Sequence, residues 1–435
     1  MKGRLLSIVG LLCGSAFVAA AWPACSSPGG QGSPADGGVG DVADARDAGA
    51  SVDSASDAEV QPVWDPVWHL TAPATYPQAG PDGQPSCGTG CRIALNWPVH
   101  SGRPSLMHAY TESAVADYGD DGLFFTRVGD TSSSLLVRNP IKAGVGQYGV
   151  AEPSLSGDLA AYVLVDQSGA TQFFQLEVMS VVTGERKPAY RIRWGGASAP
   201  GPFATSLNGK YLFWAEDGVG LRSLSLSTGA VRTLVPGAFF CVNMAANDRG
   251  VLCCDSDRGI VTFTDQETGQ VTAIDAGGGA QFDGELSPDR RWYVWVDYRD
   301  PPGRLSDYVS RSGGEIYLRD LAAGTTARLT FDSPDAPRAK TYPSTDGKIA
   351  VWNEIPDGLD PNPSSNTAVY DGSTTMVVLD LSTNKKCRVD LGIPYTIQRM
   401  SVHGRHVYGD FAGADAMHLA DLNLDDPGLK WTCTP

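Results

Sequence analysis

Four acidic residues stand at one fixed distance from the start of four similar segments of the chain. Each segment opens with a turn rich in Ser, Asn, Asp or Gly, and the acid follows ten residues after its first position: Glu216, Asp255, Asp297 and Glu354. Carboxylate oxygens are good ligands for Ca²⁺, and crowded carboxylates also attract cationic groups. These acids therefore indicate either a rim that holds a structural Ca²⁺ or a cationic partner, or solvated strand ends too far apart to share a ligand.

An aromatic residue precedes three of these acids by two positions. Trp214, Trp295 and Trp352 occupy that place, and Cys253 occupies it before the remaining acid. Residues two apart point to the same side of a strand. We therefore expect strands with the aromatic residue inside the protein and the acid at the strand's end.

Two long polar stretches follow the last two acids, at 298–314 and 355–373. Long loops on a rigid scaffold often carry binding residues. From these stretches the sequence predicts the following binding residues, beside the four acids: Tyr298, Arg299, Arg304, Tyr308, Asp357 and Tyr370. The alternative is that both are tolerated insertions, because loop entropy grows slowly with length.

The segments that carry these residues repeat along the chain. Copies of the turn and the strand after it start at Asp117, Ser154, Ser206, Ala245, Ser287, Ser344 and Ser401. A second strand pair with its own turn follows most copies, as in LRSLSLSTGAVRTLV at 221–235. Units of roughly 40 residues with four strands are typical of β-propellers. We predict an all-β protein, a seven-bladed β-propeller of four-stranded blades, with eight blades as the alternative.

Two stretches resemble a known type of repeat. GEIYLRDLAAGTTARLTF at 314–331 and ELSPDRRWYVW at 285–295 resemble the WD-like repeats of TolB-type propellers, and the resemblance covers about residues 113–433. It implies the repeat type and the fold of a propeller over 113–435. TolB proper also has an N-terminal α/β domain, which residues 63–112 lack, so the resemblance does not imply its role. We expect residues 63–112 to form an N-terminal cover or a closing strand.

The cysteines suit an exported protein, in which disulfides are permitted. Cys241 precedes one turn and Cys253 and Cys254 follow it, so Cys241 lies opposite one of these two across a hairpin. A cross-strand disulfide, with Cys253 as the candidate partner, and buried free thiols are the two alternatives. Cys87 and Cys91 flank a Gly-Thr-Gly segment and could close a small loop. They lack a second Cys/His pair, so zinc is not expected.

The N-terminus is typical of an exported chain. Residues 1–24 combine a short basic start with an apolar stretch, as in a secretory signal. WPAC at 22–25 resembles the lipobox of bacterial lipoproteins and makes Cys25 the lipidated residue; a soluble secreted protein is the alternative. Residues 25–62 are rich in Gly, Ala, Ser and Asp and suit a disordered tether.

The formal net charge of −16 argues against nonspecific binding of nucleic acid, which needs a basic surface. The six histidines form no recognised metal-ligand spacing with acids, and no G-x-S-x-G motif is present, so we predict no catalytic residue, no metal site and no cofactor beyond the Ca²⁺ alternative. The sequence favours an outer-membrane or periplasmic lipoprotein that binds another envelope protein or a glycan. The alternative is a carbohydrate-active lyase or hydrolase that uses the same face.

Overall fold

The computed structural model describes most of the chain from Gln61 onward. The described residues are 61–69, 72–79, 88–100, 108–110, 114–119, 122–130, 132–138, 148–166, 172–194, 205–216, 219–237, 241–255, 260–275, 281–299, 314–332, 338–355, 375–391, 397–412 and 417–434. Within them the chain forms strands and turns, and no helix is long and apolar enough to cross a membrane. The prediction of an all-β protein is confirmed.

The described strands form seven antiparallel sheets, whose strands are named from the centre of the molecule outward. Sheet 1 contains β3 (His108–Tyr110), β4 (Ala114–Gly119), β5 (Gly122–Arg127), β6 (Ser133–Arg138) and β1 (Gln78–Ala79). Sheet 2 contains β7 (Tyr148–Ser156), β8 (Leu159–Asp166), β9 (Gln172–Ser180) and β10 (Arg186–Trp194). Sheet 3 contains β11 (Thr205–Leu207), β12 (Tyr211–Glu216), β13 (Gly220–Ser225) and β14 (Val231–Pro236). Sheet 4 contains β15 (Cys241–Asn247), β16 (Gly250–Asp255), β17 (Ile260–Asp265) and β18 (Val271–Ala273).

The last three sheets follow the same order. Sheet 5 contains β19 (Gln281–Leu286), β20 (Trp292–Asp297), β21 (Glu315–Asp320) and β22 (Thr325–Arg328). Sheet 6 contains β23 (Ala339–Thr345), β24 (Ile349–Ile355), β25 (Thr375–Asp380), β26 (Lys385–Asp390) and β30 (Lys430–Thr434). Sheet 7 contains β27 (Ile397–His403), β28 (His406–Ala412), β29 (Met417–Asn423) and β2 (Cys91–His100).

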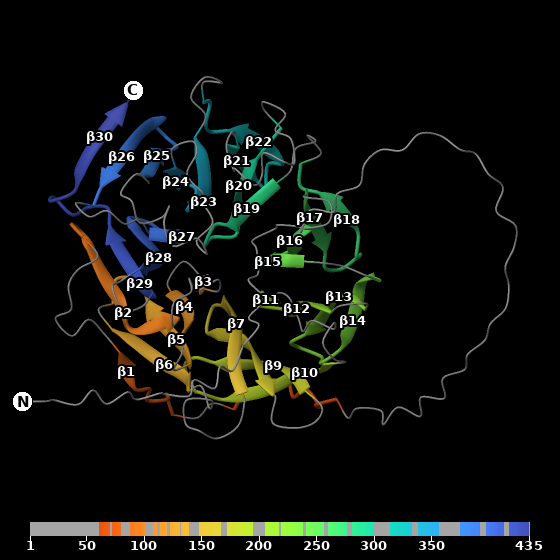
Figure 1. The fold of residues 1–435 in the computed structure, drawn as a ribbon. Helices are drawn as coiled ribbons and strands as arrows, with labels where there is room; N and C mark the ends of the chain where they lie inside the picture. Colours follow the sequence, from red (N-terminus) through yellow and green to blue (C-terminus); the bar gives the residue numbers. More distant parts are fainter. Residues whose placement is uncertain are drawn as a thin grey trace, which may run out of the picture.

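The seven sheets stand around a common centre, with the first strand of each sheet nearest to it (Figure 1). Innermost strands of successive sheets contact one another, and β2 of sheet 7 contacts β4 of sheet 1. The fold is therefore a β-propeller. The N-terminal strand β2 closes the ring as the outer strand of sheet 7, and the last strand, β30, adds a fifth strand to the outer edge of sheet 6.

Tryptophans fill the space between the sheets. Trp214, Trp295 and Trp352 are each 0% exposed and belong to clusters between sheets 2 and 3, sheets 4 and 5, and sheets 5 and 6. Each lies on the second strand of its sheet and faces the preceding sheet. This packing explains the aromatic residue of the repeat, since every such ring covers the face that the neighbouring sheet would otherwise expose.

The serine that opens the repeat links neighbouring sheets. The Ser154 hydroxyl accepts a hydrogen bond from the backbone N–H of Leu207 at 2.7 Å, and the Ser206 hydroxyl accepts one from Ala246 at 2.8 Å. Ser344 repeats the contact with Val402 at 3.0 Å. In each case the partner lies on the innermost strand of the next sheet. The serine of the repeat is therefore a structural residue.

Replacement of Ser206 by alanine tests this role. The hydroxyl is buried, so its loss leaves the backbone N–H of Ala246 without its partner. An unsatisfied buried donor costs about 1–3 kcal/mol, and we expect a fall of that size in the free energy of unfolding measured with urea. The control is Ser227→Ala at an exposed turn, for which a change within about 0.5 kcal/mol is expected. Equal changes in the free energy of unfolding for Ser206→Ala and Ser227→Ala would contradict a structural role of the Ser206 hydroxyl.

The turn of sheet 5 is longer than those of the other sheets. In sheet 6 the repeat serine, Ser344, pairs with Val351, and in sheet 5 the same position is taken by Glu285, which pairs with Val294. Ser287 therefore lies two residues after the serine position, inside the turn. Arg290 in this turn has a φ of 61° and donates hydrogen bonds to the carbonyls of Leu155 and Leu207 at 3.0 and 3.3 Å. These carbonyls belong to the innermost strands of sheets 2 and 3. The inserted turn thus carries an arginine across the centre of the ring.

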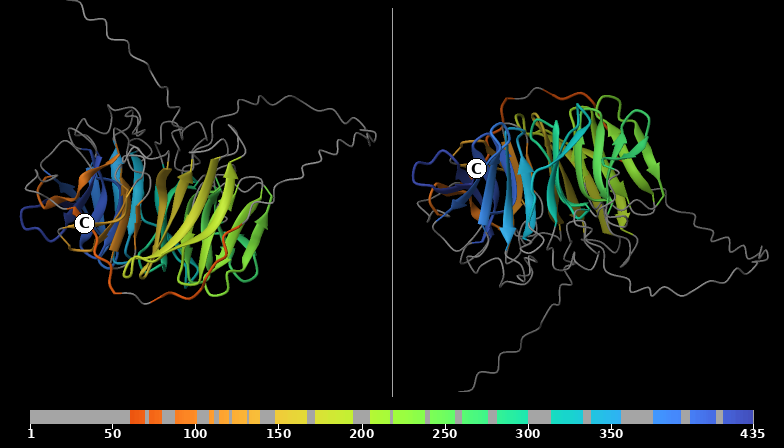
Figure 2. Two further views of the ribbon diagram at one scale, coloured as in Figure 1. Left: turned by 90° about the horizontal axis from the view of Figure 1, so that it is seen from below. Right: turned by 90° about the horizontal axis from the view of Figure 1, so that it is seen from above.

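Residues 61–69 and 72–79 form a strap along the outside of sheets 3, 2 and 1. The Trp64 indole donates to the carbonyl of Leu226 at 2.9 Å, and the Lys187 ammonium lies 4.3 Å from the centre of the Trp68 ring. The N–H of Ala74 donates to the carbonyl of Val182 at 2.9 Å. Leu226 and Val182 lie in turns between the third and fourth strands, so we name this side of the ring the strap face. Figure 2 shows the strap, in red and orange, along that face.

Candidate functional site

The opposite side of the ring is the side on which β20 ends at Asp297 and β24 ends at Ile355. We name it the loop face, because the two long predicted loops begin there. The four acids of the repeat also end their strands on this side. The pairing of the first two strands confirms that the acids are equivalent. In each sheet the acid follows, by three residues, the residue that pairs with the serine position of the repeat; the four acids are Glu216, Asp255, Asp297 and Glu354.

Three of these acids bind the indole of the tryptophan two residues earlier. The Trp295 Nε1 donates to Asp297 at 2.9 Å, and the Trp352 Nε1 donates to Glu354 at 3.3 Å. Trp214 contacts Glu216 in the same way at 3.4 Å. The tryptophan and the acid therefore form one unit on the face of the strand that packs against the preceding sheet. The side chain of Asp255 lies outside the described residues.

Cations complete each of these units. Arg222 on the neighbouring strand forms an ion pair with Glu216 at 3.0 Å. Arg299 pairs with Asp297, and the Gln281 amide donates to the same carboxylate at 3.2 Å. Asp297 is 0% exposed and Glu354 is 1% exposed. Asp297 and Glu354 therefore lie in the wall of the ring as buried ion pairs, and Glu216 is partly buried beside Arg222.

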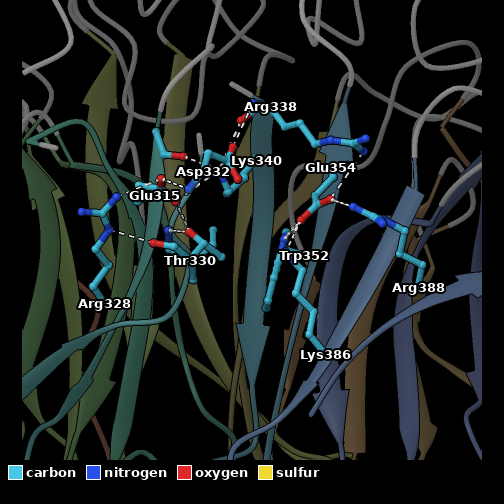
Figure 3. A network of polar contacts seen from close by, with 12 residues as sticks. Glu315, Arg328, Thr330, Asp332, Arg338, Lys340, Trp352, Glu354, Lys386 and Arg388 are labelled. Carbon is cyan, nitrogen blue, oxygen red and sulfur yellow. Dashed lines mark hydrogen bonds and ion pairs between the residues drawn. The ribbon is translucent and has the colours of Figure 1, made fainter. Parts of the chain in front are cut away.

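The largest group of such contacts joins sheets 5 and 6 (Figure 3). Its centre is Lys340 on β23, which is 0% exposed. The Lys340 Nζ lies 2.6 Å from the carboxylate of Asp332 and 3.3 Å from that of Glu315. It also donates to the carbonyls of Gly314 and Arg338, at 3.0 and 3.3 Å. A buried ammonium requires such partners, because its transfer from water is costly.

The network continues outward on both sides of Lys340. Glu315 is 1% exposed and also pairs with Arg328 at 3.0 Å, and it accepts a hydrogen bond from Thr330. Asp332 accepts the backbone N–H of Arg338 at 2.9 Å. The members of this ion-pair network are Glu315, Arg328, Asp332, Arg338, Lys340, Glu354, Lys386 and Arg388. It fixes the positions at which the chain leaves sheet 5 and enters sheet 6.

Glu354 is surrounded by three cations. Lys386 lies 2.7 Å away, Arg388 3.1 Å and Arg338 3.6 Å. Burial raises the pKa of the Glu354 carboxyl, but hydrogen bonds and charge from Lys386 and Arg388 outweigh it, so the pKa lies below its ordinary value of 4.5. The carboxylate therefore stays ionised at neutral pH. A group held so firmly in its charged form is poorly suited to act as a general acid at that pH.

Of the residues predicted in the two long loops, the structure describes Arg299 and Tyr298. Arg299 is described and pairs with Asp275 at 3.0 Å as well as with Asp297. Tyr298 is 4% exposed and packs with Val296 and Ile316. The expectation of an exposed aromatic side chain at Tyr298 is not met, because the chain stays against sheet 5 for one more residue after β20, and a role of Tyr298 in binding stays a prediction. The remaining predicted loop residues lie outside the described residues: Arg304, Tyr308, Asp357 and Tyr370.

The structure forms the expected disulfide between Cys241 and Cys253 and another that the sequence did not indicate. Cys387 on β26 is bonded to Cys433 on β30, and the two residues are directly opposite in the ladder. Cys91 is also disulfide-bonded, while Cys25 and Cys87 lie outside the described residues. Among the described residues, no group of three or more His, Cys, Asp or Glu side chains is arranged to hold a metal ion.

Sequence reasoning also missed the cations that neutralise the acids. Lys386 and Arg388 are two residues apart on β26, so they point to one side of the strand, and that alternation was visible in KKCR at 385–388. Their partner could not be read from the sequence, because Glu354 lies on a strand that does not pair with β26.

No protein-family model matches the chain, and no curated protein sequence is significantly similar to it. Solved structures of similar fold include oligogalacturonate lyase from Vibrio parahaemolyticus, 12% identical over 81% of this chain and 98% of that chain, with a TM-score of 0.48. TolB from Acinetobacter baumannii is 13% identical over 73% of this chain and 62% of that chain, with a TM-score of 0.30. The β-propeller domain of the Trilobed protease from Pyrococcus furiosus is 12% identical over 66% of this chain and 84% of that chain, with a TM-score of 0.40.

Proposed function

We propose that this chain is an exported, lipid-anchored, seven-bladed propeller of the TolB type that binds a protein partner in the bacterial cell envelope. Each of the seven sheets is one blade. Cys25 carries the lipid, and residues 25–62 are the tether between the membrane and the strap. The propeller has no chemistry of its own and works as a binding module through its loop face.

One observation carries this proposal: the repeat acids seen on the loop face are already neutralised by neighbouring side chains. Glu216, Asp297 and Glu354 each have an indole donor and at least one cation. Catalytic acids and bases need pKa values near the working pH, whereas the pKa of Glu354 is shifted the other way. The pairs of Asp297 and Glu354 instead hold the strand ends that precede 300–313 and 356–373.

The strap supports the choice of face. It contacts turns of sheets 2 and 3 on the strap face and pairs with the edge of sheet 1 through β1. Gln61, the first described residue, exchanges hydrogen bonds with Arg191 on β10, the outer strand of sheet 2. The tether therefore joins the propeller at the outer edge of sheet 2. A partner bound at the loop face would not have to displace the chain's own N-terminal segment.

A capture experiment tests the proposal. The full chain is immobilised and exposed to solubilised envelope proteins, beside a variant in which 300–313 and 356–373 are replaced by short turns. We expect one protein to be retained by the intact chain and lost from the trimmed one, as read by mass spectrometry. The control shortens only 195–204, which joins sheets 2 and 3 on the same face, and it should retain the partner.

Identical species on all three chains would contradict the proposal. Screens for glycan binding and cleavage would then follow, because a carbohydrate-active enzyme is the alternative that uses the same face. Calcium is tested in the same preparation. A midpoint of thermal unfolding that rises with Ca²⁺ but not with Mg²⁺ would establish the structural ion, which needs oxygen ligands beyond the paired acids.

A further inference from the structure

The junction of sheets 5 and 6 holds more positive charge than its own carboxylates require. In the ion-pair network five cations meet three carboxylates: Arg328, Arg338, Lys340, Lys386 and Arg388 against Glu315, Asp332 and Glu354. The whole chain has the opposite balance, with a formal net charge of −16. A local excess of cations in an acidic protein marks a place where an anion would be attracted.

The excess is concentrated around Glu354. Its single carboxylate faces the three members of what we name the cation cluster, which are Arg338, Lys386 and Arg388. One of these would satisfy the charge of Glu354. The cluster is therefore larger than the fold needs, whereas the two carboxylates of Glu315 and Asp332 are matched by two cations, Lys340 and Arg328.

The cation cluster is open to solvent although its carboxylate is not. The side chains of Arg338, Arg388 and Lys386 are 40%, 37% and 30% exposed, while that of Glu354 is 1% exposed. In addition, the Arg388 Nε is buried without a hydrogen-bond partner among the described residues. A guanidinium carries five N–H donors and an ammonium three, so the exposed parts of these side chains keep donors that the single carboxylate of Glu354 cannot occupy.

An exposed aromatic ring lies beside this network. Phe331 is 73% exposed, and the Arg328 guanidinium lies 4.7 Å from the centre of its ring. The next residue, Asp332, holds the backbone N–H of Arg338. Exposed aromatic residues next to arginines are enriched at the centres of protein interfaces, where they contribute most of the binding energy.

We propose that the cation cluster binds the carboxylates of an acidic segment of a protein partner, with Phe331 at the edge of the same surface. Guanidinium groups pair with carboxylates through two parallel hydrogen bonds, which suits Arg338 and Arg388. Lys386 adds a point charge whose position is set by the Trp352 ring, 5.4 Å away. The inference rests on the proposed binding function and specifies the chemistry of the partner.

The test measures binding of a fluorescein-labelled octaglutamate peptide to the full chain by fluorescence anisotropy at low salt. The variant Lys386→Gln/Arg388→Gln removes two cations and leaves Arg338 beside Glu354. We expect its dissociation constant for the peptide to rise by about tenfold or more. The control Lys348→Gln/Lys385→Gln removes the same charge from two exposed lysines, one in the turn before β24 and one next to Lys386 that points to the opposite side of β26. Its constant should stay within about twofold of that of the unchanged chain.

Thermal unfolding is recorded for each variant, so that a loss of binding is separated from a loss of structure. If the double variant does not fold, Arg338→Gln provides the measurement, because Arg338 makes the longest of the three contacts with Glu354. No binding by the unchanged chain, or equal loss in the control, would overturn the inference. Binding of alginate, a uronate polymer, without binding of the peptide would also overturn it in favour of a glycan.

The two proposals fail separately. If trimming of the long loops abolishes capture of a partner but Lys386→Gln/Arg388→Gln does not, the binding function stands and the cation cluster is not the site. If capture is lost from both variants but retained by the lysine control, the two proposals are supported together. If no chain captures a partner and the peptide binds as expected, only the acidic-segment site is supported.

Discussion

Replacement of Lys340 by methionine is expected to lower the free energy of unfolding by about 3–5 kcal/mol, the range for removal of one partner from a buried ion pair. The Lys340 ammonium is 0% exposed and contacts four oxygens, two from carboxylates and two from carbonyls. Methionine fills a similar volume, so the loss reports the charge and not a cavity. Urea unfolding followed by tryptophan fluorescence measures it.

Two further variants make this prediction specific. Lys348→Met removes a lysine from an exposed turn of the same sheet, and its effect should stay within about 0.5 kcal/mol. Of the two carboxylates that Lys340 contacts, Asp332 is the nearer, and Lys340→Met leaves it without this partner. Lys340→Met/Asp332→Asn also removes this negative charge, so it should be more stable than Lys340→Met alone. If the double variant is instead less stable by the sum of both single effects, Lys340 and Asp332 do not act as a pair.

Much of the fold could be predicted because turn residues and apolar alternation act between neighbouring residues and can be recognised in the sequence. A turn of Ser, Asp and Gly followed by an aromatic strand defines the first hairpin of most sheets, and the alternation of apolar residues defines the strands. Gly347 shows why this turn requires glycine: its φ is 82°, and a Cβ at this position would lie 2.3 Å from the Trp292 indole. Arg290 adopts a positive φ in the longer turn of sheet 5, and a count that starts at Ser287 did not reveal the two extra residues of this turn.

A closing strand within 63–112 was one of the two expectations for that segment, but the strand that it joins could not be predicted in the same way. β2 pairs with β29, and β30 pairs with β26 after the chain has built the whole of sheet 7. Hydrophobic alternation identifies a strand and its buried face but does not name its partner. The same limit applied to the acids, whose spacing placed them at strand ends. The cations that pair with them, such as Arg222 and Arg388, lie on other strands, so the pairing of the acids could not be predicted before the fold was known.

The disulfide that sequence reasoning missed stabilises this closure. Cys387 and Cys433 are 46 residues apart, and the chain between them contains β27, β28 and β29. The cross-link therefore encloses the three strands of sheet 7 to which β2 must add. A cross-link that closes a loop of this length restricts the unfolded chain and contributes about 2–4 kcal/mol in typical cases.

We expect Cys387→Ser/Cys433→Ser to lower the free energy of unfolding by about that amount and to release β30 from sheet 6. Most residues of β30 are exposed, so only hydrogen bonds to β26 and the packing of Trp431 hold it once the cross-link is gone. Trypsin should then cut after Lys430 sooner than in the unchanged chain, as followed by mass spectrometry. The control Thr432→Ala alters an exposed position on the same strand and should keep both the stability and the rate of cleavage. Unchanged cleavage in the serine variant would show that backbone pairing is sufficient to hold the chain end, because β30 would then cover the edge of sheet 6 without the covalent bond.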